Sequence, residues 1–391
     1  MNMRAIPTSE SEVGDVVRQA RADGNPLEIR GGGTRRALGR PVQAAATLSL
    51  EALKGVTVYE PGALTLIARA GTPLSEVEET LKSGGQRLAF EPMDHRALLG
   101  SDGEPTIGGV VACNISGPRR IQAGACRDSL IGVRYVDGAG EVIKNGGRVM
   151  KNVTGYDLVK LMCGSWGTLG VLTELAFKVL PAHEREATLS IGGLTTAEAV
   201  GAMSDALGSP FDVTGAAHLP DRNGAPQTIV RVEGLAGQVD YRLERLQEIF
   251  ANYSDLKVLD GDDHRRLWQH VRNVERFQDT TRPVWRLSVK PSDAIAIESA
   301  LRDELDADAM FDWGGGLIWA EVPDHDTAHA DAVRAIVGRF GGHATLVRAP
   351  ETVRAFVEVF QPQIPGLASV SRAIREKFDP DNILNPGRMT A

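Results

Sequence analysis

The sequence predicts an α+β fold built as two lobes. The chain has 391 residues, more than the roughly 250–300 residues at which a single hydrophobic core stops growing. Segments with the alternating pattern of strands stand between segments with helical spacing, and residues 137–140, which read D-G-A-G, are typical of a hairpin turn. A mixed architecture with antiparallel strand pairs is therefore expected.

Local signals place the elements of the first lobe in order. Residues 8–12, T-S-E-S-E, are typical of a helix cap, and apolar residues at helical spacing follow from Val13 to Ala20. A second helix is expected to begin with Thr72 as its cap and Pro73 at its first position. Strands are predicted at residues 27–29, 57–59, 64–70, 130–136, 141–143 and 171–179, the last with the alternation of an edge strand.

The most distinctive stretch is residues 106–117, which read T-I-G-G-V-V-A-C-N-I-S-G. Glycine and alanine leave little side chain between the backbone and a neighbour, so successive N–H groups can turn toward one anion and form a nest. A phosphate or pyrophosphate suits such a nest, and a tight turn in a buried strand is the alternative. A second glycine loop, R-G-G-G-T at residues 30–34, follows a short strand.

The second loop does not fit the Rossmann fingerprint. The pattern G-x-G-x-x-G would need glycine at Arg36, and Gly39 and Pro41 follow where an amphipathic helix should open. A nicotinamide-binding Rossmann site is therefore not predicted.

Net charge and the number of cysteines argue against nucleic-acid-binding, iron–sulfur and disulfide-rich proteins. A net charge of −8 argues against nucleic acid as a partner. Arginines cluster locally, at residues 30–40 and 119–127, which suits a small anion, although solvated surface arginines are the alternative.

Three cysteines without C-x-x-C spacing exclude the common iron–sulfur clusters and a disulfide framework, and they indicate a reducing compartment. No signal peptide or membrane-spanning run is found, so a cytoplasmic protein is expected, held at a membrane only through partners.

Five motifs occur in a characteristic order: R-G-G-G-T at residues 30–34, the stretch at 106–117, K-N-V-T-G-Y-D-L at 151–158, G-T-L-G-V-L-T-E-L at 167–175 and F-D-P-D-N-I-L-N-P-G-R-M at 378–389. In this order they resemble the vanillyl-alcohol-oxidase, or PCMH-type, family of FAD-binding proteins. Within that family, residues 116–120 and 149–157 are most similar to the FAD-binding subunits of glycolate oxidase complexes.

The resemblance implies a PCMH-type FAD-binding domain of two α/β subdomains at residues 1–181. It also implies a cap domain with an antiparallel sheet and helices at 182–346, and a C-terminal segment at 347–391 that returns to the FAD domain. The residues implied in FAD binding are Gly31, Gly32, Gly33, Thr34, Gly108, Gly109, Asn114, Gly117, Gly167, Gly170 and Val171. Relatives with covalent flavin often carry histidine in the first glycine loop, which here ends in Thr34, so noncovalent FAD is expected. In the C-terminal segment, the asparagine or arginine either faces the cofactor or belongs to a packed surface turn.

The cap offers one weak candidate for substrate binding. L-W-Q-H-V-R at residues 267–272 resembles a cap helix whose arginine grips a substrate carboxylate, which makes Arg272 the candidate; an exposed, salt-bridging arginine is the alternative. His325 and His329 are four residues apart, but they lack a third ligand, so no metal site is predicted. No catalytic base is assigned.

Three functional hypotheses follow from the resemblance. The first is an FAD-binding subunit of a glycolate oxidase complex, working with a larger FAD-bearing catalytic subunit and an iron–sulfur subunit, and oxidising the small 2-hydroxy acid glycolate to glyoxylate. The second is a self-sufficient FAD-dependent 2-hydroxy-acid dehydrogenase of the D-lactate type. The third is a non-catalytic scaffold that keeps the fold.

Overall fold

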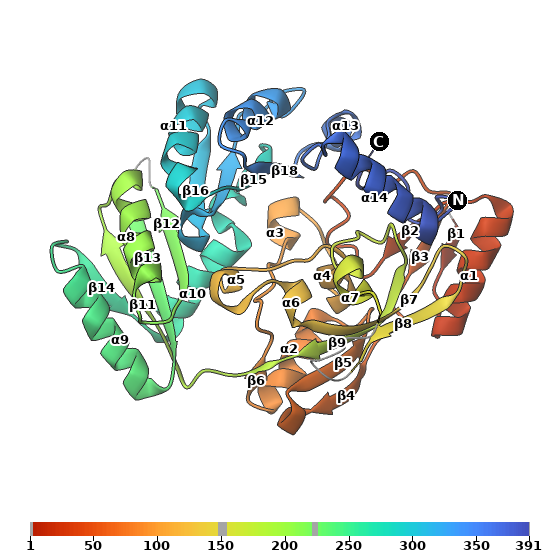
Figure 1. Cartoon of the computed structure of the whole chain (residues 1–391), viewed down its shortest axis with the longest axis horizontal. Coiled ribbons are helices and arrows are strands. Elements are labelled where there is room, and N and C mark those ends of the chain that lie inside the picture. Colours follow the sequence, from red (N-terminus) through yellow and green to blue (C-terminus); the bar gives the residue numbers. More distant parts are fainter. Residues whose placement is uncertain (1–2, 148–154, 221–225, 391) are drawn as a thin grey trace. The chain divides into compact units, whose positions relative to one another are not determined.

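The computed structural model of the chain describes residues 3–147, 155–220 and 226–390. Its contacts divide the chain into two compact units (Figure 1). The first comprises Met1–Ser116, Gly124–Ala182 and Pro362–Ala391, and the second comprises Gly117–Ala123 and His183–Gln361. The chain thus leaves the first unit after Ala182 and returns at Pro362, whereas the boundaries expected from the sequence are residues 181 and 347. Most of the motif at residues 149–157 lies outside the described residues.

The first unit contains a small parallel sheet and a larger antiparallel one. The small sheet has the strand order β1-β3-β2, with β1 (Met3–Ala5), β2 (Leu27–Arg30) and β3 (Ala46–Ser49). The larger sheet has the order β4-β5-β9-β7-β8, with β4 (Val56–Glu60), β5 (Thr65–Arg69), β7 (Leu130–Val136), β8 (Val142–Gly146) and β9 (Val171–Lys178). A short antiparallel pair joins β6 (Gln86–Arg87) to β10 (Leu180–Pro181).

The predicted hairpin is confirmed, because β7 and β8 pair in antiparallel fashion across residues 137–140. The prediction of an edge strand at 171–179 is wrong. β9 lies between β5 and β7, and nearly all of its residues are buried because both of its faces are covered.

The helices of the first unit are α1 (Glu10–Asp23), α2 (Leu74–Ser83), α3 (Arg96–Leu99), α4 (Ile107–Ala112), α6 (Cys126–Ser129), α7 (Leu158–Met162) and α14 (Pro365–Phe378). The Ser9 side chain caps α1 by accepting from the Glu12 N–H, as the capping signature predicts. Thr72 does not cap α2. Its hydroxyl donates instead to the Arg69 carbonyl at 2.6 Å, and Pro73 occupies the cap position.

The second unit is built on one antiparallel sheet with the strand order β14-β11-β13-β12-β16-β17-β15-β18. Its strands are β11 (Arg185–Gly192), β12 (Val213–Leu219), β13 (Gln227–Gly234), β14 (Leu256–Leu259), β15 (Val284–Ser288), β16 (Asp308–Asp312), β17 (Leu317–Glu321) and β18 (His343–Arg348). Its helices are α5 (Arg120–Ala123), α8 (Thr196–Gly208), α9 (Ala236–Ile249), α10 (Gly261–Asn273), α11 (Ala294–Leu305), α12 (Ala330–Gly338) and α13 (Glu351–Phe356). The sequence pattern also predicts strands at residues 285–289 and 317–322 and a helix at 241–250, and the structure confirms them as β15, β17 and part of α9.

The two faces of this sheet differ in polarity because side chains alternate along each strand. One face is apolar and packs against α8, α9, α11 and α12, which together form the core of the unit. The other face carries charged residues, among them Arg231 and Glu233 on β13 and Arg286 on β15. Helix α10 packs on this polar face, where the Trp268 ring lies against Arg231. Within the described ranges, no helix is long and apolar enough to cross a membrane.

His218 makes the stability of the second unit depend on pH. The side chain is fully buried on β12 and bonds Thr228 through Nδ1 at 2.9 Å. Burial lowers the pKa of His218 to about 4, whereas an exposed histidine has a pKa of 6.5. The neutral ring is therefore preferred in the folded state. Its contribution to stability is present above pH 6.5 and is lost as the pH falls toward 4.

We expect the free energy of unfolding of the second unit to fall by about 2 kcal/mol between pH 7 and pH 5 through this residue. Urea denaturation at a series of pH values measures the slope. The His218→Gln variant, which does not titrate, should show a correspondingly shallower slope, and equal slopes in the two proteins would contradict the assignment.

Candidate functional site

A pocket opens in the first unit between the loop after β2 and helix α4. Of the residues predicted to bind a cofactor, those that line the pocket are Gly31, Gly32, Gly33, Thr34, Gly108, Gly109, Gly167 and Gly170. Segments from four parts of the chain therefore converge on one cavity: the two glycine stretches, the turn before β9 and the C-terminal segment.

Three predicted residues are not among those that line this pocket. Asn114 accepts hydrogen bonds through Oδ1 from the Arg127 N–H at 3.1 Å and from the Cys163 thiol at 3.6 Å. Gly117 belongs to the second unit, where its carbonyl accepts from Trp313 Nε1 at 3.1 Å. Val171 is fully buried in the core of the first unit. In these contacts all three residues hold parts of the protein together.

The two glycine stretches differ in how the N–H groups of their glycines are bonded. The N–H groups of Ile107 and Gly108 donate to the carbonyls of Thr72 and Ala70, and the N–H of Gly109 donates to the Thr106 hydroxyl. These groups are bound within a capped helix, α4, which replaces the nest expected there. By contrast, the N–H groups of residues 32–35 have no acceptor among the described residues. Four successive donors without a protein acceptor, on residues that line a cavity, are suited to an anion.

The glycines of this loop are required by close contact with the segment before α4. A Cβ atom on Gly32 would collide with the Glu104 carbonyl oxygen, and one on Gly31 would collide with the Thr106 hydroxyl. Gly33 adopts a φ of +80°, in the left-handed region that favours glycine, and a Cβ there would meet no atom within 4 Å. The first two glycines therefore fix the loop against the protein, while the third shapes its open side.

Arg35 supplies positive charge to this pocket. Its side chain is buried and donates through Nη2 to the Met93 carbonyl at 3.1 Å, while Nε has no partner among the described residues. Burial lowers the pKa of Arg35, but a guanidinium still keeps its proton at neutral pH. Sequence reasoning placed Arg35 only within a general arginine cluster. The signal that singles it out is its position directly after the G-G-G-T loop.

Glu28 balances the other arginines of the loop. Its carboxylate is buried and pairs with Arg30 and with Arg36, and it lies 3.7 Å from Arg388. Burial alone would raise the pKa of Glu28, but Arg30 and Arg36 hold it below its ordinary value. The carboxylate therefore stays ionised and is committed to these arginines, which leaves the charge of Arg35 for the pocket.

The C-terminal segment closes one side of the pocket. Asn385 accepts from the Ile29 N–H at 2.8 Å and donates to the Trp166 carbonyl at 2.9 Å, and it lines the cavity. Arg388 donates to the carbonyls of Arg36 and Leu38. The sequence left open whether these residues face a cofactor or belong to a packed turn. Both Asn385 and Arg388 line the pocket, and their polar groups also anchor the loop after β2.

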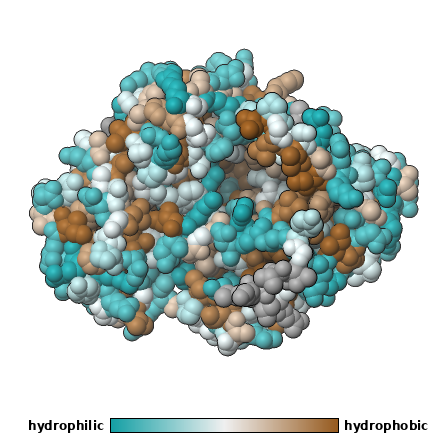
Figure 2. All heavy atoms as spheres, viewed as in Figure 1, coloured by the Kyte–Doolittle hydropathy of each residue, from teal (hydrophilic) through white to brown (hydrophobic). Residues whose placement is uncertain are grey.

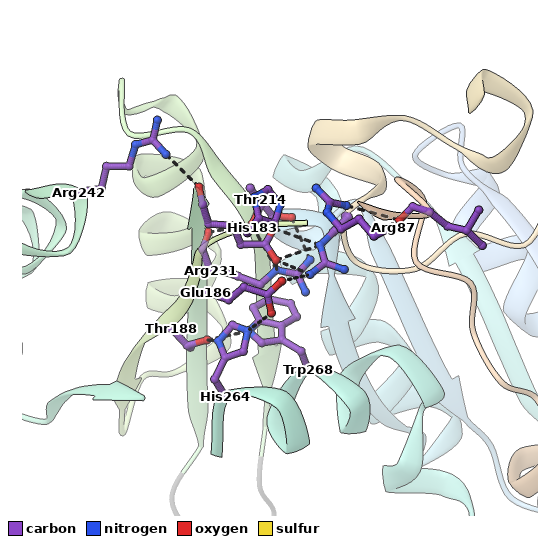
Figure 3. A network of polar contacts seen from close by, with 12 residues as sticks. Arg87, His183, Glu186, Thr188, Thr214, Arg231, Arg242, His264 and Trp268 are labelled. Carbon is purple, nitrogen blue, oxygen red and sulfur yellow. Dashed lines mark hydrogen bonds and ion pairs between the residues drawn. The ribbon is translucent and has the colours of Figure 1, made fainter. Parts of the chain in front are cut away.

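The polar face of the second unit carries a network of buried charges (Figure 3). Arg119 donates through Nε to both oxygens of Glu233, at 3.0 and 3.1 Å, and through Nη2 to Glu186 at 3.0 Å. Burial alone would raise the pKa of Glu233, but Arg231 and Arg119 hold it well below its ordinary value. The network ties residues 117–123 to the sheet, so Arg119 of the S-G-P-R-R motif has a structural role.

The predicted substrate residue Arg272 lies in the last turn of α10. It is half-buried, and its Nε donates to the neighbouring Asn273 Oδ1 at 3.3 Å. The His325 and His329 rings stack with their centroids 4.4 Å apart just before α12. Among the described residues there is no group of three histidine, cysteine, aspartate or glutamate side chains placed to hold a metal ion.

Comparisons with known proteins agree with this site. Residues 2–146 match a family model described as an FAD binding domain. The chain is 35% identical over 378 residues to the glycolate oxidase subunit GlcE of Escherichia coli K12, covering 96% of this chain and 95% of that protein. It is 26% identical to the glycolate oxidase subunit GlcD of Bacillus subtilis 168, covering 94% of this chain and 84% of that one.

The fold is shared more widely than the sequence. A structure of alkyldihydroxyacetonephosphate synthase superposes with a TM-score of 0.72 at 18% identity, covering 98% of this chain and 75% of that one. The predicted PCMH-type α+β fold is thereby confirmed, and so is FAD as the cofactor.

We expect Arg35→Gln to weaken FAD binding by about tenfold or more, since a hydrogen bond from a charged group contributes about 1.5–3 kcal/mol. Arg36→Gln is the matched control. It removes the same charge at the next residue, where the arginine side chain is 59% exposed. The measurement is the FAD dissociation constant of each apoprotein, obtained from flavin fluorescence. Equal weakening in both variants would mean that only general charge matters.

Proposed function

Because this chain belongs to the family of FAD-linked oxidoreductases that includes glycolate oxidase subunit GlcE, we propose that it is the FAD-binding subunit of a complex that oxidises glycolate to glyoxylate. FAD supplies the capacity to accept two electrons from a hydroxy acid. In the proposed complex, a larger FAD-bearing subunit works beside this chain and an iron–sulfur subunit receives the electrons. The names GlcE and GlcD, which both denote subunits of glycolate oxidases, support this assembly.

The free N–H groups of residues 32–35 are the observation that carries the FAD assignment. We place the FAD pyrophosphate at this nest, with Gly108 and Gly109 of the other glycine stretch beside it and Arg35 as the counter-charge. Gly167 and Gly170 then face the adenine end. Because the donors are fixed by the contacts of Gly31 and Gly32, they need little reorganisation when the pyrophosphate binds.

The flavin is proposed to be noncovalent. Gly31, Gly32, Gly33 and Thr34 include no histidine or cysteine that could attach it. Cys113 does line the pocket, but burial raises the pKa of its thiol to about 11. Since the thiolate is the nucleophile, the raised pKa disfavours attachment of the flavin at Cys113.

Acid precipitation of the purified protein should therefore release all of its flavin into the supernatant. The measurement compares the visible absorbance of the supernatant with that of the pellet. A yellow pellet whose flavin survives washing would show a covalent bond and contradict this part of the proposal.

Two observations support the proposal that electrons pass from this chain to a partner subunit. They are the number of cysteines and an exposed apolar helix face. The chain has three cysteines, and common clusters need four. Helix α14 has no buried residue, and Leu367 and Val370 on it are 52% and 56% exposed, next to Ile364 at 73%. Figure 2 shows apolar atoms at the surface where Figure 1 places this helix. Apolar residues gathered on one exposed helix are typical of a subunit contact, and we assign this face to a partner subunit of the complex.

The proposal predicts how the bound flavin responds to substrate. When glycolate is added anaerobically to the isolated chain, the visible absorbance of the oxidised flavin should persist, and it should bleach once the partner subunits are added. Bleaching by glycolate or D-lactate in the isolated chain would instead establish the self-sufficient dehydrogenase. A chain that takes up no FAD at saturating concentration would establish the scaffold.

A further inference from the structure

A positively charged cluster surrounds Trp313 on the polar face of the second sheet. Arg286 lies on β15 between Trp285 and Leu287, which are buried in the helix-covered core. Because side chains alternate along a strand, Arg286 lies on the opposite face. There it is in register with Trp319 of β17 and Thr345 of β18.

Two guanidinium groups lie over the Trp313 indole. The Cζ atom of Arg120 is 4.7 Å from the ring centroid, and that of Arg286 is 5.1 Å from it, both within cation–π range. Burial, and after it the charge of Arg120, lowers the pKa of Arg286 to about 10. Like charges held this close repel each other, and a bound anion relieves the repulsion.

Arg286 differs from the other charged residues of this face. Arg119 and Arg231 are paired with Glu233, whereas the Arg286 guanidinium forms no hydrogen bond or ion pair with any residue that the structure describes. The carboxylate that acts on Arg286 is Asp312, whose Oδ1 is engaged by the Trp313 N–H at 2.7 Å.

The cluster is held in place before any ligand arrives. Trp313 donates through Nε1 to the Gly117 carbonyl at 3.1 Å, which joins the indole to the segment that carries Arg120. The neighbouring Arg119 is anchored by Glu233 and Glu186. Prior fixing of donors lowers the entropic cost of binding.

We propose that Arg286 and Arg120 bind the carboxylate of a small organic acid beside the Trp313 indole. A guanidinium fits a carboxylate through two parallel hydrogen bonds, and the Trp313 ring offers a flat apolar surface to a short carbon chain. Identifying the acid as the 2-hydroxy-acid substrate rests on the proposed function. The site itself rests on the cluster, and it lies on different elements from Arg272.

The test is calorimetric titration of the FAD-loaded protein with glycolate under anaerobic conditions. Arg286→Gln should weaken glycolate binding about tenfold or more, which is the loss expected for one charge-assisted pair. Arg286→Lys keeps the charge but not the paired hydrogen bonds and should give an intermediate affinity. Arg266→Gln on α10, whose side chain is 76% exposed, is the control and should bind like the wild type. Flavin content and circular dichroism establish that each variant is folded.

Glycolate affinity that is unchanged in both Arg286 variants would overturn the proposal, as would a loss seen in Arg272→Gln instead. Inorganic phosphate that displaces glycolate as well as acetate does would show a general anion site and would also overturn it. Failure of the proposed function is distinguishable, because binding that depends on Arg286 without flavin reduction in the presence of partners leaves this site standing. Flavin reduction with binding indifferent to Arg286 refutes this site alone.

Discussion

The structure of the first unit depends on how tightly the loop after β2 is pressed against the segment before α4. Gly31 and Gly32 leave no room for a Cβ atom, so the backbone lies directly against Glu104 and Thr106. Fixing the loop in this way leaves the N–H groups of residues 32–35 without internal acceptors. Four donors without a protein acceptor beside a buried guanidinium suit an anion, which can accept hydrogen bonds from them. In the proposed site, the contacts that fix the loop are therefore also what leaves its N–H groups available to the cofactor.

Distant parts of the chain support the same loop. Thr106 caps α4 and so directs the N–H of Gly109 back into the protein, while Asn385 and Arg388 anchor β2 and the loop from the C-terminal side. This explains why a segment near residue 385 belongs to the first unit although about half of the chain separates it from the other elements of that unit. In the second unit, the arginines of the polar sheet face also differ in their partners. Arg119 forms ion pairs with Glu233 and Glu186, whereas Arg286 forms none with a described residue.

Much of the fold was predictable because its signals are local. The cap at Ser9, the hairpin across residues 137–140 and the strands around 285 and 317 follow from side-chain chemistry within a few residues. The position of β9 was not predictable, since whether a strand is central depends on partners far away in sequence. Thr72 illustrates the same limit: a hydroxyl before proline fits a cap, but the Arg69 carbonyl competes for it.

For the candidate site, too, local sequence signals were predictable and contacts with distant residues were not. Glycine composition indicated both loops, but it could not tell which one keeps its N–H groups free, because that depends on acceptors such as Thr72 and Ala70 that lie elsewhere in the chain. Arg35 and Arg286 do not stand out in the sequence. Burial singles out Arg35 and the position over Trp313 singles out Arg286, and neither guanidinium forms an ion pair with a described residue. Asn114, Gly117 and Val171 occur in motifs of the family, yet their contacts here are with the protein itself.

The claim that the pyrophosphate is the part of the cofactor that this chain grips is tested most directly by comparing FAD with riboflavin, which lacks it. Titration of the apoprotein with each compound, followed by calorimetry at constant ionic strength, gives the two affinities. We expect FAD to bind at least a hundredfold more tightly, since several charge-assisted hydrogen bonds of about 1.5–3 kcal/mol each are lost with riboflavin. Equal affinities would mean that the isoalloxazine ring, and not the pyrophosphate, supplies the binding energy.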